Sequence, residues 1–151
     1  MPVLNWRRAA TAVSSAVLLA TGIMAVPAAS AEAAPARDCY SRNGFPTKGG
    51  NNIGDRPPRY KFSNSPYIGA RYDSCENAIT VYFGGTSRTD TTHYTMRWSG
   101  DAGGWHDQKM HNGAHRMWTI EAPGNDYNFL VQACNGNACT RWSPQIYVNA
   151  R

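Results

Sequence analysis

The stretch APGNDYNFLVQA, residues 122–133, decides the fold. After a Pro-Gly-Asn-Asp turn signal, an aromatic or aliphatic residue stands at every second position: Tyr127, Phe129, Val131 and Ala133. Successive side chains of a β-strand point to opposite faces, so this period predicts a strand with one buried face. It is the most strongly patterned segment of the chain.

Four shorter segments around it alternate in the same way. Their apolar positions are Ile79, Val81 and Phe83; Tyr94, Met96 and Trp98; Trp118 and Ile120; and Ile146 and Val148. Turn residues such as Gly and Asn separate them, and no segment has the pattern of an amphipathic helix. Several short strands without helices predict an all-β fold, an antiparallel sandwich.

The first 33 residues have the composition of a secretory signal peptide. Two arginines at positions 7 and 8 precede an uncharged run rich in Ala, Val and Leu, residues 9–26. Small residues then allow cleavage after Ala31 or Ala33. A membrane anchor is the alternative, because the run approaches the ~20 residues that a spanning helix needs. We favour export, which predicts a secreted, extracellular protein.

Removing 33 of the 151 residues leaves 118, enough for one domain with a modest core. Residues 34–56 are rich in Gly, Asn and Pro and show neither helical nor strand periodicity, so they predict an arm before a sandwich at 57–151. Loss of Arg7 and Arg8 reduces the net charge from +5 to +3, or to +4 where cleavage after Ala33 also removes Glu32. The remaining basic residues are scattered along the chain, which argues against nucleic-acid binding.

All four cysteines, Cys39, Cys75, Cys134 and Cys139, follow the predicted signal. An even number in a small exported domain predicts two disulfides. Cys134 and Cys139 flank an Asn-Gly turn, so we expect them to pair across a hairpin, and Cys39 to pair with Cys75. A zinc site is the alternative, but the spacing lacks paired Cys-x2-Cys elements. We expect neither a metal nor a cofactor.

From about Pro57 to the C-terminus the chain resembles the fibronectin type III domain. The resemblance is most specific in residues 122–133, which are similar to the family's L-x-P-G-T-x-Y-x-F-x-V-x-A passage into strand F. It implies an immunoglobulin-like sandwich, with the Tyr127 hydroxyl bonded to upstream backbone. The cysteine spacing alone also resembles the neocarzinostatin group of chromophore carriers.

Three further segments resemble the type III domain more loosely. Residues 79–83 resemble strand B, residues 94–98 strand C, and residues 141–144 (RWSP) the entry to strand G. The last segment also resembles half of the W-S-x-W-S motif of cytokine receptors, in which an arginine stacks on a tryptophan. Within this sandwich, Trp118 and Trp142 have structural places in the core or at its edge.

The candidate binding residues are Trp105, His106, His93 and Arg97. Trp105 follows two glycines in a predicted loop and lacks core partners, so its indole could stack on a sugar ring or anchor a protein interface. The alternative is that it folds back over the edge of the sandwich. His93 and Arg97 lie on the outward side of their predicted strand.

Histidines also raise two chemical alternatives. His111 and His115 have the spacing of metal ligands on a helix, but the Asn-Gly pair between them predicts a turn, so we expect solvent-exposed loop histidines. A small hydrolase would need His106, Asp107 and a serine to form a catalytic triad. The chain has no G-x-S-x-G, H-E-x-x-H or P-loop motif, and we expect no enzymatic activity.

The leading hypothesis is a secreted, monomeric, non-catalytic binding module, similar to the type III domains that bacteria attach to extracellular glycan-degrading enzymes. Its expected partner is an extracellular polysaccharide or protein, and neither nucleic acid nor a membrane. One alternative is an inhibitor of an extracellular hydrolase that presents the stiff loop 134–139. Others are a carrier with an open cleft between its sheets, and a hydrolase that uses His106 or His111.

Overall fold

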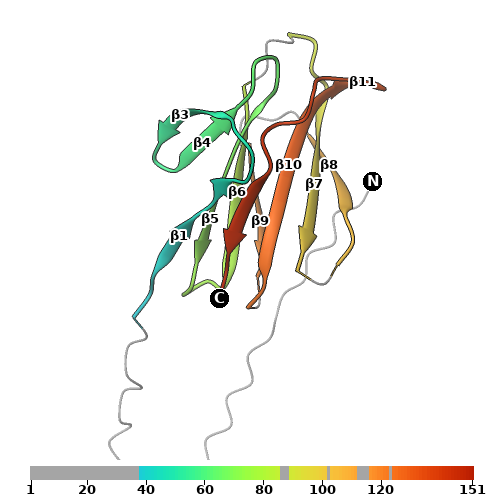
Figure 1. Cartoon of the computed structure of the whole chain (residues 1–151). Coiled ribbons are helices and arrows are strands. Elements are labelled where there is room, and N and C mark those ends of the chain that lie inside the picture. The colour runs from blue at the N-terminus through green and yellow to red at the C-terminus, as the bar shows by residue number, and fades with distance from the viewer. Residues whose placement is uncertain (1–37, 86–88, 102, 112–115, 123) are drawn as a thin grey trace, which may run out of the picture. The chain divides into compact units, whose positions relative to one another are not determined.

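The computed structural model describes residues 38–85, 89–101, 103–111, 116–122 and 124–151. Their strands are β1 (Ser41–Asn43), β2 (Phe45–Pro46), β3 (Asn51–Asp55), β4 (Pro58–Lys61), β5 (Tyr67–Asp73), β6 (Ala78–Gly84), β7 (His93–Gly100), β8 (His106–His111), β9 (Met117–Glu121), β10 (Asp126–Asn135), β11 (Ala138–Cys139) and β12 (Ile146–Asn149). They form two antiparallel sheets that pack as a sandwich (Figure 1). The predicted fold class, an antiparallel β-sandwich with two disulfides, is confirmed.

The first sheet has the strand order β3-β4-β5-β6-β9, and β1 pairs with the part of β5 that β4 leaves open. The second sheet has the order β2-β12-β10-β7-β8, and β11 pairs with the end of β10. The segment with the strongest alternation in the sequence, β10, lies in the middle of the second sheet. It pairs with β7 from Tyr127 opposite Gly100 to Cys134 opposite His93.

The inner faces of the two sheets meet in one core. It consists of Ile68, Ala70, Tyr72, Ile79, Val81, Phe83, Tyr94, Met96, Ala122, Tyr127, Phe129, Val131, Ala133, Ile146, Val148 and Ala150. Full burial of an Ile or Phe side chain contributes about 1.5–3 kcal/mol, so these positions carry much of the stability. Phe83 and Tyr94 join the sheets edge to face, with ring centroids 5.3 Å apart. This filled interior counts against the open cleft that a carrier needs.

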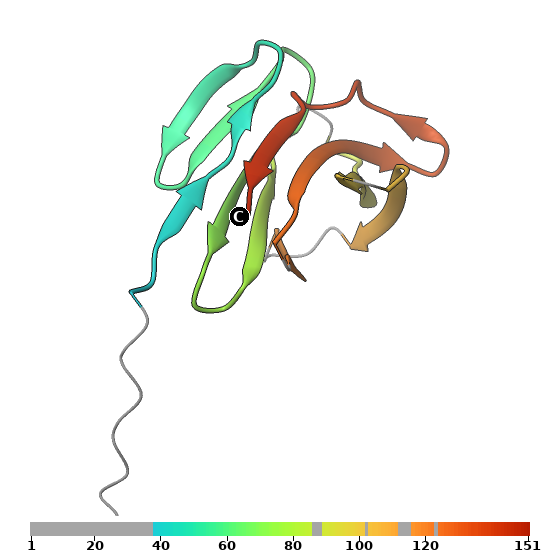
Figure 2. The same cartoon turned by 60° about the horizontal axis from the view of Figure 1, so that its bottom comes forward.

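The segment before residue 57 differs from the prediction. We expected an arm without strands at 34–56, but β1, β2 and β3 lie there, and the described part of this segment, from residue 38 onward, belongs to one compact unit with the sandwich. These strands are two to five residues long and mostly exposed, so their side chains carry no alternation. Backbone pairing holds them. β1 joins the first sheet and β2 joins the second, and Figure 2 shows this cyan segment crossing between them.

The segment that contains His106 and His111 also differs from the prediction. It was expected to be a loop, but it forms the edge strand β8, paired with β7. Five of its six residues are exposed, so neither face is apolar enough to give an alternating pattern. The expected solvent exposure of His111 is confirmed, whereas His115 lies outside the described residues.

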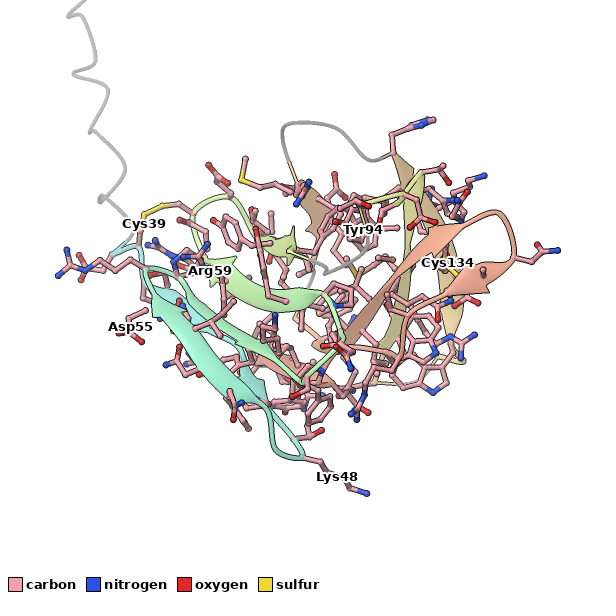
Figure 3. All side chains as sticks on the ribbon, turned by 90° about the horizontal axis from the view of Figure 1, so that it is seen from above. Cys39, Lys48, Asp55, Arg59, Tyr94 and Cys134 are labelled. Carbon is pink, nitrogen blue, oxygen red and sulfur yellow. A yellow bond between two sulfur atoms is a disulfide. The ribbon has the colours of Figure 1, made fainter. Side chains whose placement is uncertain are left out.

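Both predicted disulfide pairings are confirmed. Cys39, which precedes β1, is bonded to Cys75 in the turn after β5, and Cys134 is bonded to Cys139 across the β10–β11 hairpin. Cys39 and Cys134 lie on opposite sides of the sandwich (Figure 3). Such bonds are typical of an oxidising compartment. The predicted signal peptide lies outside the described residues, among which no helix could cross a membrane.

Candidate functional site

Arg97, one of the candidate binding residues, is already engaged by its neighbours on the outer face of the second sheet. Its Nε and Nη2 donate to the two carboxylate oxygens of Asp107, its partner on β8, both at 2.7 Å. Its guanidinium lies 4.8 Å from the ring centroid of Trp142. The hydrogen bond from Arg97 lowers the pKa of the Asp107 carboxyl. An arginine–tryptophan stack of the kind found in the W-S-x-W-S motif is therefore present, and it is formed by Arg97 and Trp142.

The other candidate residues are not gathered around Arg97. Trp105 is 50% exposed, and His106 stacks on Trp98 with ring centroids 4.6 Å apart. His93 lies opposite His111, five residues along β7 from Trp98, a distance of about 17 Å at ~3.3 Å per residue. Partial burial, followed by the charge of Lys109, lowers the pKa of His93. The four candidates thus lie on β7, on the edge strand β8 and just before β8, without converging on one place.

Trp118 and Tyr127, two of the three predicted structural aromatics, lie against or in the core, whereas Trp142 stacks with Arg97 on the outer face of the second sheet and is not part of the core cluster. Trp118 is half-buried against the core, and its ring centroid lies 6.1 Å from that of Trp98. Tyr127 is buried and stacks on Phe129 at 6.1 Å. The hydrogen bond expected from the Tyr127 hydroxyl stays a prediction, because the upstream turn includes residue 123, which lies outside the described residues.

A more compact candidate site lies on the outer face of the first sheet. It is a solvent-open groove of about 440 Å³, which we call the arginine groove. Its lining consists of Arg56, Pro57, Arg59, Tyr67, Tyr82, Arg116 and Met117. The alternation of the strands explains its floor: Ile68, Val81 and the half-buried Trp118 face the core. Their neighbours Tyr67, Tyr82 and Met117 therefore point outward.

One wall of the groove is the turn between β3 and β4, and it depends on Gly69. A Cβ atom at Gly69 would collide with the carbonyl oxygen of Pro58 and would lie 3.2 Å from Cγ of Arg59. Only a residue without a side chain lets the hairpin approach the outer face of β5 this closely. Figure 3 shows Arg59 and Asp55 on the hairpin side of the molecule, opposite the Cys134 disulfide.

Two of the arginines, Arg59 and Arg116, also pack closely against glycines. A Cβ atom at Gly54 would lie 2.7 Å from Nη2 of Arg59, and one at Gly84 would lie 2.5 Å from Cδ of Arg116. The Arg59 guanidinium lies 5.4 Å from the centroid of the Tyr67 ring, and its buried Nε makes no hydrogen bond to any described residue. Packing against backbone and rings therefore holds these charged groups in place, whereas an arginine on an open surface is free to move.

The lining of the arginine groove is positively charged. It contains three arginines and no acidic residue, and neither Arg56 nor Arg59 pairs with a carboxylate among the residues that the structure describes. Guanidinium groups bind carboxylate, sulfate and phosphate oxygens through pairs of parallel hydrogen bonds. Elsewhere in the described chain, no three His, Cys, Asp or Glu side chains gather as metal ligands would. The groove is thus suited to an anionic ligand.

Sequence reasoning missed the groove because its residues are far apart in the chain. Arg56 and Arg59 belong to the segment in which no strand was expected, and Arg116 follows them by more than fifty residues. The only local signal is the excess of Arg over Lys, which indicates directed anion contacts but does not place them.

The architecture makes this chain a two-sheet, disulfide-bonded β-sandwich protein. No family model matches its sequence, and no curated protein matches it. Among solved structures it is similar to one titled "Myokine structure". The two chains are 13% identical, the match covers 49% of this chain and 82% of the other, and the TM-score is 0.41.

Proposed function

We propose that the protein is a secreted, non-catalytic binding module with a type III-like sandwich, and that its ligand is an anion held in the arginine groove. The observation that carries the proposal is the convergence of Arg56, Arg59 and Arg116 on one hollow without an acidic neighbour in its lining. Like charges brought together in this way repel one another, so their clustering favours a role in binding. The two disulfides and the signal-like N-terminus support an extracellular location.

The size of the effect follows from the contacts that the groove offers. A hydrogen bond to a charged group contributes about 1.5–3 kcal/mol, so losing two guanidinium contacts should weaken binding at least about tenfold. If surface charge alone attracted the ligand, removal of any cationic side chain would cause a smaller, salt-dependent loss of affinity. The test must therefore compare variants that have equal net charge.

The experiment is affinity electrophoresis of the disulfide-bonded protein in gels that contain polygalacturonate, dextran sulfate or neutral dextran. The groove variant is Arg56→Gln/Arg59→Gln, and the control of equal charge is Lys48→Gln/Lys109→Gln, whose lysines line no part of the groove. We expect retardation by the anionic polymers only, weakened at least about tenfold in the groove variant and less than about threefold in the control. Equal losses in both variants, or no retardation by either polyanion, would refute the proposal.

A further inference from the structure

The arginine groove is not isolated on the outer face of the first sheet. A hollow of about 420 Å³ shares Arg56 and Pro57 with it, and one of about 190 Å³ shares Tyr82. Both of these adjoining hollows include Arg71. The three hollows therefore form one connected surface along β5, which extends for about 20 Å from Tyr67 to Asp73 at ~3.3 Å per residue. A ligand longer than the groove would therefore also contact one or both of the adjoining hollows.

The chemistry changes between the groove and the adjoining hollows. The larger hollow is lined by Ser41, Asn43 and Asp55 beside its two arginines, and the smaller by Asp73, Glu76 and Thr80 beside Arg71 and Tyr82. Carboxylate, amide and hydroxyl groups are partners for neutral hydroxyl groups, because they accept or donate single hydrogen bonds. The same carboxylates repel a second anion.

Tyr82 lies where the groove meets the smaller hollow. Its side chain makes no hydrogen bond and no ring contact with the described residues, unlike the ring of Tyr67, which lies under the Arg59 guanidinium. It is half-buried in the outer face and lies opposite Gly69 and Met117 in the register. An aromatic ring without protein partners, next to hydrogen-bonding groups, is suited to the apolar face of a sugar ring.

From these observations we infer that the ligand is a sparsely charged acidic polysaccharide, in which neutral sugars separate the sugars that carry a carboxylate. The groove takes one acidic sugar, and the adjoining hollows take neutral neighbours through their hydroxyls and the Tyr82 ring. This inference rests on the proposed anion-binding function. It also predicts that nucleic acid and densely sulfated glycans bind less tightly, because Asp73 and Glu76 would repel their closely spaced charges.

The test compares oligosaccharides of equal length by isothermal titration. Hyaluronan carries a carboxylate on every second sugar, polygalacturonate carries one on every sugar, and single-stranded DNA serves as the dense phosphate polymer. We expect the disulfide-bonded protein to bind the hyaluronan oligomer at least about fivefold more tightly than the galacturonate oligomer or the DNA. Equal or weaker binding of the hyaluronan oligomer would overturn the inference.

Two variants examine the cause of this preference. Asp73→Asn/Glu76→Gln removes both charges of the smaller hollow, and an asparagine in place of Asp73 keeps the oxygen that accepts from the backbone N–H of Cys75 at 2.9 Å. It should bind the galacturonate oligomer about fivefold more tightly and the hyaluronan oligomer with less than about twofold change. The matched control, Asp101→Asn/Asp107→Asn, removes two charges that lie outside the three hollows. If it changes the two affinities as the test variant does, the inference fails.

The outcomes also separate this inference from the proposed function. If Arg56→Gln/Arg59→Gln abolishes binding of all the anionic oligomers and the intact protein binds them equally, the anion-binding groove stands and the sparse glycan is wrong. If the groove variant binds as the intact protein does, both proposals fail. Tyr82→Ala should weaken hyaluronan binding at least about fivefold, and the DNA less than twofold, if the ring carries a sugar.

Discussion

Removal of the Cys39–Cys75 disulfide should destabilise the protein about twice as much as removal of Cys134–Cys139. The first bond joins residues 36 apart in the sequence and the second joins residues 5 apart. Closing these loops in the unfolded chain costs entropy that corresponds to about 4 kcal/mol for the longer loop and about 2 kcal/mol for the shorter. The folded state should change little, because β1 keeps its pairing with β5.

The residues beside the first disulfide support this expectation. The backbone N–H of Tyr40 donates to Oγ of Ser74 at 2.8 Å, and the N–H of Ser74 donates to the carbonyl oxygen of Tyr40 at 3.0 Å. These contacts hold the chain in register without the covalent bond. The loss in Cys39→Ser/Cys75→Ser should therefore arise mainly from the gain in entropy of the unfolded chain.

The assay is urea denaturation at neutral pH, followed by tryptophan fluorescence, of the intact protein and of the two double Cys→Ser variants. The free energy of unfolding is read from each curve with the dependence on urea fitted separately. We expect a loss of about 4 kcal/mol for the first variant and about 2 kcal/mol for the second. Equal losses, or a larger loss for the Cys134–Cys139 pair, would refute the loop-entropy argument.

Three single substitutions test the polar contacts of the sandwich. Tyr94→Phe removes a buried hydroxyl that has no hydrogen-bond partner among the described residues, so thermal unfolding should show unchanged stability or a gain of about 1 kcal/mol, and a clear loss would contradict this. The hydrogen bond to Asp126 raises the pKa of Tyr147, so its stabilisation is present below pH ~10 and lost as pH rises through the higher folded pKa. Tyr147→Phe should flatten this alkaline decline in urea titrations. The hydrogen bond from Arg97 lowers the pKa of Asp107, so its stabilisation is present above pH ~4 and lost on acidification. Because the pair is about half exposed, Asp107→Asn should remove less than about 1 kcal/mol and reduce the acid dependence.

The sandwich could be predicted from sequence where a strand has one buried face. In β6, β7 and β10 the alternation of apolar and polar residues places Val81, Met96 and Val131 in the core, as the structure confirms. The disulfide pairings could also be predicted, because the Asn-Gly turn places Cys134 opposite Cys139. The signals of the strand faces and of the Cys134–Cys139 bond lie within a few neighbouring residues, and Cys39–Cys75 is then the pairing that remains.

The missed features have no such local signal. β1, β2 and β3 are held by backbone hydrogen bonds to distant strands, and their exposed side chains show no period. The arginine groove forms only when the β3–β4 turn lies over the outer face of β5 and the residue before β9 reaches the same place. The contacts of Arg59 and Arg116 with Gly54 and Gly84 therefore depend on the tertiary fold.

The glycines beneath the groove have a consequence for the ancestry of this site. A methyl group at Gly54, Gly69 or Gly84 would occupy space that an arginine or the hairpin turn now fills. Descendants of the same ancestor that keep Arg59 and Arg116 but replace these glycines should have lost the groove. Descendants that keep the glycines should retain its shape even where an arginine has become another long side chain. The three glycines, more than the arginines, would then indicate which related proteins have kept the groove.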